Sequence, residues 1–379
     1  MENTTVSFVV PCYKLAHLLP KCINSILSQS YANFEVLVMD DCSPDNTAEV
    51  ARSFDDPRVI YIRNDPNLGP LRNYNKGITL SRGKYVWLIS ADDYLRRPYV
   101  LQRYVELMEK HPNVGYTFCP GISVRNGEET ELLNYSTYGN RDRIANGHVF
   151  LKRLLYGNLV LAPSAMARRE CYEKISFFPL DVRWADVPID MVWGGDWYLW
   201  CAFALFFDVG YFAEPMVCYR EHDLSMTNTV TQEKIENCAA ADIAVPWMIR
   251  EKANDSGLRN VSTDCLRAVA YEYTRQCVSK RYEWLNRLSK WSVTIDQFEA
   301  SLCRSTESEK ERNWIRARVL AGIADRLYWQ GDRASVRKFL RAGLQKDPWM
   351  VKAYGKLLFL LFGKSGDYVR RILCSLRRY

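Results

Sequence analysis

Two pairs of adjacent aspartates mark the ends of two apolar segments of the chain. Asp92 and Asp93 follow the run VWLI, which has no helical spacing and is typical of a buried strand. Asp40 and Asp41 end the similar run FEVLVMDD. Adjacent carboxylates repel each other, and burying them is costly unless a positive partner lies close by. A divalent cation with phosphate oxygens in its shell would relieve the repulsion between Asp92 and Asp93.

Alternating strands and helices must position these acids. The first 118 residues predict strands at 6–13, 34–41, 58–62, 86–89 and 114–118, and helices at 17–29, 42–54, 68–81 and 98–111. This alternation predicts an α/β fold with a largely parallel sheet. Ligands of such sheets bind beyond the carboxyl ends of the strands, so Tyr13 and the two acidic pairs are expected to meet in one crevice. There Asp41 would accept the N3–H of a uracil or thymine ring, and Tyr13 would stack on that base.

Each acidic pair, taken alone, has a simpler explanation. Acidic pairs in loops are common and usually form a solvated turn or a helix cap. Their recurrence at two strand ends of one predicted sheet favours a ligand site. A signalling receiver domain also gathers aspartates at strand ends. Its acidic pair follows the first strand, however, where this chain has Pro-Cys-Tyr, and such a domain is much shorter.

Three stretches, in order, resemble glycosyltransferase family 2. They are VSFVVPCYKLAHLLPKCINSILSQSYANFEVLVMDDCSPDNT, NLGPLRNYNKGI and GKYVWLISADD. The resemblance covers roughly residues 5–228 and is strongest over 5–118. It implies an inverting enzyme of the GT-A fold that transfers a hexosyl or hexosaminyl group from a nucleotide-diphosphate sugar. The expected nucleotide is UDP, and the expected cofactor is Mn²⁺ or Mg²⁺.

The resemblance also implies roles for residues at the strand ends. Asp41 would read the pyrimidine, and Tyr13 would lie against the base, close to Pro11 at the end of the first strand. Asp92 would contact the ribose, and Asp93 would be the direct metal ligand.

Inverting transfer needs one more group, because the acceptor hydroxyl must lose its proton in a single displacement. The family places the responsible carboxylate just ahead of an aromatic helix, and Asp196 in WGGDWYLWCAF aligns with it. Gly195 stands where the family commonly has Glu. Asp190 is the alternative base, and a helix N-cap is the alternative role of Asp196.

Two basic residues complete the implied site. Arg72 lies in the segment that often faces the diphosphate, although a solvated arginine on a helix face explains it almost equally well. His222 lies in CYREHDLSMT, which resembles the Tyr-Arg-x-His-x-x-Ser element of the family. This histidine would be a second metal or diphosphate contact, or else a hydrogen-bonded structural residue.

The composition is that of a globular protein: 379 residues, 48% hydrophobic and 25% charged. None of the twelve cysteines forms a CxxC pair or a Cys/His cluster, which favours reduced thiols and a cytoplasmic location. The sequence predicts neither a signal peptide nor a membrane span.

Charge is distributed unevenly along the chain. Residues 333–379 carry a net charge of +10, so the remainder of this +7 chain carries −3, and we expect no nucleic-acid partner. The segment 354–379 joins an apolar run to a basic end. This pattern predicts a helix that either packs internally or makes a peripheral contact with the inner face of an anionic membrane.

The expected domains are a GT-A domain at 1–228 and a helical region at 229–379. The first divides into a nucleotide-binding half at 1–118 and an acceptor-binding half at 119–228. The second contains one tetratricopeptide-like hairpin near 320–348, without a second copy. A non-catalytic nucleotide-sugar-binding scaffold that acts through this helical region is the alternative function, and the presence of Asp196 favours the enzyme. The sequence identifies neither the sugar nor the acceptor.

Overall fold

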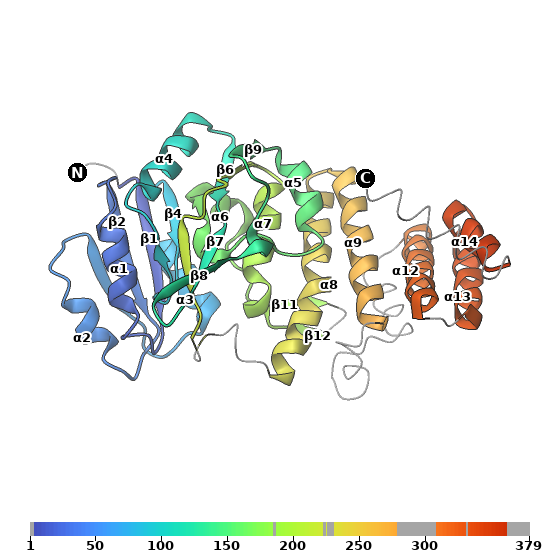
Figure 1. Ribbon diagram of the computed structural model, residues 1–379, viewed down its shortest axis with the longest axis horizontal. Coiled ribbons are helices and arrows are strands. Elements are labelled where there is room, and N and C mark those ends of the chain that lie inside the picture. Colours follow the sequence, from blue (N-terminus) through green and yellow to red (C-terminus); the bar gives the residue numbers. More distant parts are fainter. Residues whose placement is uncertain are drawn as a thin grey trace. The chain divides into compact units, whose positions relative to one another are not determined.

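The computed structural model describes residues 4–184, 187–222, 225, 231–278, 308–330 and 333–361 (Figure 1). The chain forms two compact units. The first contains Met1–Val182, Asp190–Ala241 and Asp255–Gly257, and the second contains Arg183–Ile189, Asp242–Asn254 and Leu258–Tyr379. The domain limits predicted at residues 118 and 228 stay predictions.

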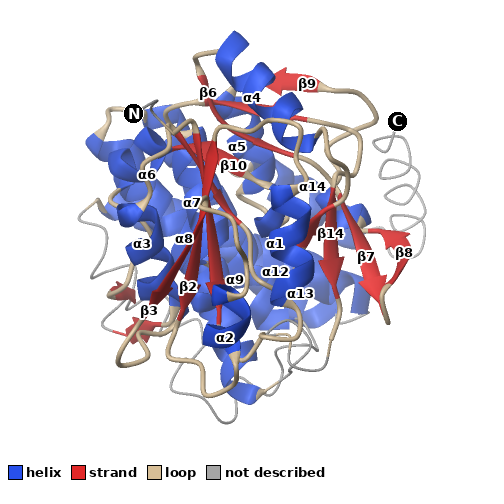
Figure 2. Ribbon diagram, turned by 90° about the vertical axis from the view of Figure 1, so that its left-hand side faces the viewer, coloured by secondary structure: helices blue, strands red, loops and turns tan. Residues whose placement is uncertain are grey.

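An eight-stranded sheet forms the centre of the first unit, in the order β3-β2-β1-β4-β10-β6-β13-β9. Figure 2 labels β2, β3, β6, β9 and β10 of this sheet. β1, β2, β3 and β4 are parallel, as are β6 and β13, whereas β10 runs antiparallel to both of its neighbours and β9 is an antiparallel edge. The predicted sheet is therefore present, with antiparallel strands added to it. The strands are β1 (Val6–Cys12), β2 (Phe34–Asp40), β3 (Val59–Arg63), β4 (Tyr85–Leu88), β6 (Val114–Phe118), β9 (Arg143–Ala145), β10 (Met166–Arg168) and β13 (Asp208–Tyr211).

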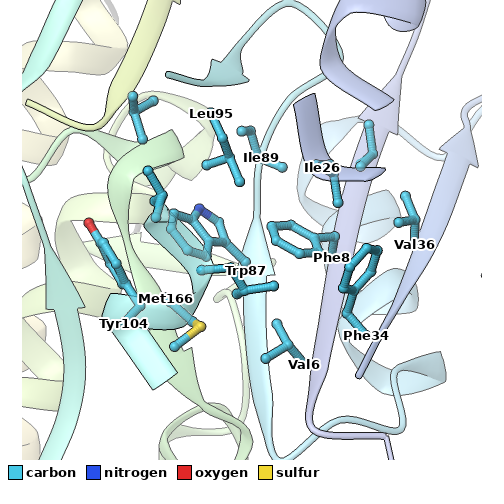
Figure 3. Packing of buried hydrophobic residues seen from close by; sticks show 14 of the residues in the cluster. Val6, Phe8, Ile26, Phe34, Val36, Trp87, Ile89, Leu95, Tyr104 and Met166 are labelled. Atoms are coloured by element: carbon cyan, nitrogen blue, oxygen red, sulfur yellow. The ribbon is translucent and has the colours of Figure 1, made fainter. Parts of the chain in front are cut away.

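The central strands are apolar because the sheet is buried. Every residue of β1 and β2 is buried, as expected for parallel strands covered on both faces. The Phe8 ring on β1 stacks on Trp87 of β4, with ring centroids 5.5 Å apart, and Tyr104 lies 4.5 Å beyond Trp87 (Figure 3). The helices of this unit are α1 (Leu19–Leu27), α2 (Thr47–Arg52), α3 (Pro70–Leu80), α4 (Val100–Lys110), α5 (Gly147–Leu154), α6 (Arg169–Ile175) and α7 (Gly195–Ala204), with short 3-10 turns η1 (Asn134–Ser136), η2 (Ala162–Ser164) and η3 (Met191–Trp193).

A second sheet brings a distant part of the chain to the end of β4. Its order is β5-β14-β7-β8, with β5 (Tyr94–Leu95), β14 (Val217–Arg220), β7 (Gly121–Arg125) and β8 (Glu128–Leu132). β5 follows the Asp92–Asp93 pair directly and pairs antiparallel with β14. This pairing sets the residues at the end of β14 beside the acidic pair, although about 130 residues separate them along the chain.

The second unit is mainly helical. It contains α9 (Arg259–Val278), α12 (Glu309–Gln330), α13 (Arg333–Lys346), α14 (Val351–Leu361) and much of α8 (Gln232–Asp255), which continues from the first unit; β11 (Val182–Trp184) and β12 (Val187–Ile189) form a two-stranded sheet. α12 and α13 occupy the segment predicted as a hairpin, and Leu320, Ala324 and Leu340 are buried there. No helix among the described residues is long and apolar enough to cross a membrane. Most of the predicted basic tail, residues 362–379, lies outside the described residues.

Candidate active site

A cavity of about 400 Å³ lies at the carboxyl ends of β1, β2 and β4. Five of the eight predicted site residues line it: Pro11, Tyr13, Asp41, Asp92 and His222. Its volume is in the range of small-molecule sites. The crevice predicted from the strand ends is therefore present in the structure.

Asp41 is the most firmly held carboxylate in the cavity wall. It is buried, and its Oδ1 accepts hydrogen bonds from Asn64 Nδ2 and Leu68 N, both at 2.8 Å. Its Oδ2 accepts one from Gly69 N at 2.9 Å. These donors come from the loop between β3 and α3, so one carboxylate fixes this loop against the end of β2. Oδ2 accepts only this one bond within the described structure, which leaves it lone-pair capacity to accept a ligand N–H.

Tyr13 is the exposed aromatic group of the cavity. Its side chain is 45% exposed, directly after the buried strand β1, and the Lys14 ammonium lies 5.0 Å from the centre of its ring. Pro11, a buried residue of β1 two positions before Tyr13, also lines the cavity. An exposed ring at the mouth of a cavity is suited to stack on a flat ligand such as a base.

The Asp92 carboxylate faces the cavity together with His222. Asp92 Oδ2 lies 3.1 Å from His222 Nε2, whereas Asp92 Oδ1 is buried without a hydrogen-bond partner in the described structure. A buried carboxylate oxygen without a partner is costly. This oxygen is therefore suited to bind a cation or a ligand hydroxyl.

Asp93 has a different environment from its neighbour. It is 3% exposed, does not line the cavity, and accepts a hydrogen bond from Arg220 N at 3.2 Å. Burial, together with the adjacent Asp92 charge, holds the pKa of Asp93 well above its usual value. The role of direct metal ligand predicted for Asp93 is untested, but the geometry places Asp92 and not Asp93 at the cavity.

Arg220 is a site residue that the sequence analysis did not assign. Its Nη2 donates to the main-chain carbonyls of Leu18 and Ala91, both at 2.9 Å, and its Nε donates to the carbonyl of Asp92. The guanidinium thus holds the loop that carries the acidic pair. The available signal was the element CYREHDLSMT, in which Arg220 precedes His222 by two residues.

Asp196 lies in the first turn of α7, outside the lining of the cavity. Its Oδ2 accepts a hydrogen bond from Asn158 Nδ2 at 2.9 Å, and its Oδ1 accepts one from Trp197 N at 2.7 Å. Burial raises the pKa of Asp196, and these two donors oppose the rise. Burial raises the pKa of Tyr74, which lines the cavity, and the Asp196 charge raises it further. Asp196 therefore lies near the cavity.

Gly195 has a steric reason to lack a side chain. A Cβ at this position would lie 3.0 Å from Phe178 Cδ1 and 3.3 Å from Leu71 Cδ2. The backbone of Phe178 is itself held by Asn75, whose amide makes two 2.9 Å hydrogen bonds with it. The alternative base Asp190 is exposed and caps the short turn η3 through a 3.0 Å bond from Val192 N.

Arg72 is not brought to the cavity. It is exposed on α3, whereas the next two residues of the helix, Asn73 and Tyr74, line the cavity. Successive residues of a helix point about 100° apart, so this arrangement turns Arg72 aside. The diphosphate contact predicted for it remains untested, and the geometry does not favour it.

A family model matches the part of the chain that contributes most of the cavity lining. The family model described as "Glycosyl transferase family 2" matches residues 7–175. This part of the chain therefore resembles a glycosyltransferase family 2 domain. The match begins in β1 and ends at the last residue of α6, so it includes both acidic pairs and stops before Asp196.

Curated relatives match parts of the chain. Uncharacterized protein MT1568 of Mycobacterium tuberculosis is 31% identical over 189 residues, which are 47% of this chain and 57% of the relative. Succinoglycan biosynthesis protein ExoO of Rhizobium meliloti is 35% identical over 133 residues, 34% of this chain and 38% of the relative. The chain thus spans less than two thirds of the length of these relatives.

A solved structure matches most of the chain. The crystal structure of S. aureus TarS 1–349 in complex with UDP-GlcNAc gives a TM-score of 0.58 at 16% identity and covers 90% of both chains. At this identity the likeness shows the fold alone. The predicted fold class is confirmed: a GT-A-type α/β domain with a mostly parallel sheet, followed by a helical C-terminal region.

The expected divalent metal would be held by side chains of the described residues. No group of three or more His, Cys, Asp or Glu side chains that could hold a metal ion is found among them. The pair Asp92 and His222 nevertheless fits Mn²⁺ or Mg²⁺, because such ions are commonly held by one or two protein ligands plus substrate phosphates. The buried, unpartnered Asp92 Oδ1 supports this fit.

Proposed function

We propose that this chain is an inverting glycosyltransferase. It moves a hexosyl or hexosaminyl group from a UDP-sugar to a saccharide or lipid-linked saccharide acceptor. The observation that carries the proposal is the cavity of the family 2 domain, which combines Tyr13, Asp41 and the Asp92–His222 pair at adjacent strand ends. The relative ExoO, whose name refers to succinoglycan biosynthesis, supports an acceptor that belongs to a growing polysaccharide.

The donor nucleotide lies between Tyr13 and Asp41 in this proposal. The exposed Tyr13 ring stacks on the uracil base, and Asp41 Oδ2 accepts the N3–H of the base. Pro11 forms the floor beneath the base. A pyrimidine with a protonated N3 is preferred because the Asp41 carboxylate, which three donors hold in place, can accept its N–H.

Asp92 and His222 would hold the divalent cation and the diphosphate. We assign the metal contact to Asp92 and not to Asp93, because Asp92 faces the cavity. When bound, the cation neutralises charge that develops on the leaving diphosphate. Asp93 and Arg220 hold the loop and β14 in register, so that Asp92 and His222 stay 3.1 Å apart.

Asp196 is the general base of the displacement. It takes the proton of the acceptor hydroxyl as the hydroxyl oxygen attacks the anomeric carbon from the face opposite the diphosphate. Burial raises the pKa of Asp196, which makes the carboxylate a stronger base than an exposed aspartate.

The proposal is tested by hydrolysis of UDP-glucose, UDP-galactose and UDP-N-acetylglucosamine, with Mn²⁺ or with EDTA, following the release of UDP. We expect slow, metal-dependent hydrolysis of at least one donor. Asp196→Asn should abolish it and leave UDP affinity within twofold of wild type, and Asp190→Asn is the matched control that keeps it. If UDP-sugars bind but no donor is hydrolysed, the chain is a nucleotide-sugar-binding scaffold. If none binds, the donor assignment is wrong.

A peripheral contact of the basic tail with the cytoplasmic face of an anionic membrane completes the proposal. Its support is the sequence of residues 354–379, which joins apolar positions to four arginines, and the preference of basic amphipathic segments for anionic lipid. Deleting residues 365–379 should abolish salt-sensitive binding to vesicles of phosphatidylcholine and phosphatidylglycerol without changing donor hydrolysis. If the full chain ignores these vesicles at low salt, the tail packs internally.

A further inference from the structure

The last residue of α5 and the segment that follows it hold the start of α7 at two points. The carbonyl of Leu154 accepts a 2.8 Å hydrogen bond from Trp197 Nε1, and Asn158 Nδ2 donates to Asp196 Oδ2 at 2.9 Å. Trp197 and Asp196 are consecutive, so both bonds act on the same turn of helix. The segment bends at Gly157, whose φ of +141° is a conformation that glycine adopts without strain.

A second hydrogen bond fixes the orientation of the Asn158 amide toward Asp196. Its Oδ1 accepts a 3.0 Å hydrogen bond from Val160 N, which turns the Nδ2 group toward the carboxylate. The other carboxylate oxygen accepts from Trp197 N. Each oxygen of Asp196 therefore has one fixed donor, and the plane of the carboxylate is set by two separate parts of the chain.

We propose that Asn158 is the positioning residue of the base Asp196: its amide orients the carboxylate toward the acceptor hydroxyl and stabilises the ionised form. This inference rests on the proposed function. Asn158 itself touches neither the cavity nor a reacting atom in this scheme. It acts only through Asp196, so its removal should alter the pH dependence of the reaction and leave donor binding unchanged.

The direction of the change follows from the surroundings of Asp196. Its carboxylate is desolvated, which raises its pKa, and the Asn158 amide is one of the donors that lower it. Among the described residues, Tyr74 on α3 and Tyr135 on η1 are titratable side chains on which its charge acts. Burial raises the pKa of Tyr74, whereas Tyr135 is 57% exposed, and nearby acidic groups raise the pKa of both phenols further, so both stay neutral in the acid range. Without the amide the ionised carboxylate loses support, and its pKa rises. Because the base must be ionised, the acid limb of the rate profile moves to higher pH.

The test compares three variants over pH 4.5–9, with UDP-N-acetylglucosamine, UDP-glucose or UDP-galactose as the hydrolysed donor and Mn²⁺ present. Asn158→Ala removes the donor, and the acid limb of kcat should move up by about one pH unit. Asn158→Asp keeps the acceptor for Val160 N but sets a second carboxylate against Asp196, so the limb should move further. Asn146→Ala is the matched control, because Asn146 caps α5 through Val149 N, a similar side chain-to-backbone bond away from Asp196.

The outcomes separate this inference from the proposed function. The inference is supported if both Asn158 variants shift the acid limb and bind UDP within twofold of wild type. The control Asn146→Ala should leave the acid limb unchanged and lower only the melting temperature. A uniform loss of rate at every pH means that Asn158 merely supports the fold, and the inference is then wrong. If wild type hydrolyses no donor, or Asp196→Asn stays active, the proposed function or its base fails instead.

Discussion

Asp41 is predicted both to stabilise the fold and to bind the nucleotide. Its replacement should therefore lower both the melting temperature and the affinity for UDP. Asp41→Ala removes the acceptor of Asn64 Nδ2, Leu68 N and Gly69 N in one step. Asp41→Asn keeps one acceptor oxygen but sets an NH₂ group against a donor that faced Oδ2. Asp41→Ala should therefore lower the stability of the fold as well as the nucleotide affinity, because the loop before α3 loses the carboxylate that holds it.

The magnitude follows from the number of bonds. A hydrogen bond to a charged group contributes roughly 1.5–3 kcal/mol, so three bonds set an upper bound of about 5–9 kcal/mol. Because the loop can relax and water can enter from the cavity, we expect about 3–5 kcal/mol for Asp41→Ala and about 1–3 kcal/mol for Asp41→Asn. In a domain of this size 1 kcal/mol corresponds to about 2–4 °C in melting temperature. Asp41→Ala should then lower it by at least 6 °C or so.

Asp40 provides the matched control at the adjacent position. It is fully buried, accepts from Tyr61 Oη at 2.6 Å and Arg63 Nη1 at 2.8 Å, and does not line the cavity. Asp40→Asn should therefore lower the melting temperature while UDP affinity, measured by calorimetry with Mn²⁺, stays within twofold of wild type. Asp41→Asn should weaken UDP binding by about tenfold or more, about 1.4 kcal/mol. Equal UDP affinities of Asp40→Asn and Asp41→Asn would refute the assignment of Asp41 to the base. A melting temperature of Asp41→Ala within 2 °C or so of wild type would refute the role of Asp41 in holding the loop before α3.

Two further predictions concern neighbouring residues. Asp92→Asn should remove most of the Mn²⁺-dependent gain in UDP affinity, whereas Asp93→Asn, which can still accept from Arg220 N, should keep it; the reverse order in calorimetry would restore the metal role to Asp93. Gly195→Glu, which installs the residue common in the family, should destabilise the fold by about 1–3 kcal/mol in urea unfolding, because its Cβ would lie 3.0 Å from a Phe178 ring whose backbone is fixed. An unchanged unfolding midpoint for Gly195→Glu would show that the ring can move aside.

The sequence predicted the sheet well because its strands are buried on both faces and are therefore continuously apolar. β1, β2, β3 and β6 lie within a residue or so of their predicted limits. The second sheet and the antiparallel β10 were not predicted, because three-residue strands and strands with exposed faces, such as β8, carry little pattern. The sequence also did not predict contacts between segments that lie far apart along the chain. No local signal indicates that Arg220 donates to the carbonyl of Leu18, or that Asn158 reaches Asp196.

The two acidic pairs also show why sequence alone could not decide which carboxylate does what. In each pair one member lines the cavity, namely Asp41 in the first pair and Asp92 in the second. The other member is buried and bound by protein groups: Asp40 forms an ion pair with Arg63, and Asp93 accepts a hydrogen bond from Arg220 N. Successive residues of an extended chain point to opposite sides, which divides Asp40 and Asp41 at the end of β2. Asp92 and Asp93 are divided by the turn that precedes β5. The division separates the charges and gives each a different partner, which is how both acids are tolerated at a buried edge. The register that selects the cavity-facing member depends on how β2 and β4 pair with β1, and this pairing is a property of the folded sheet.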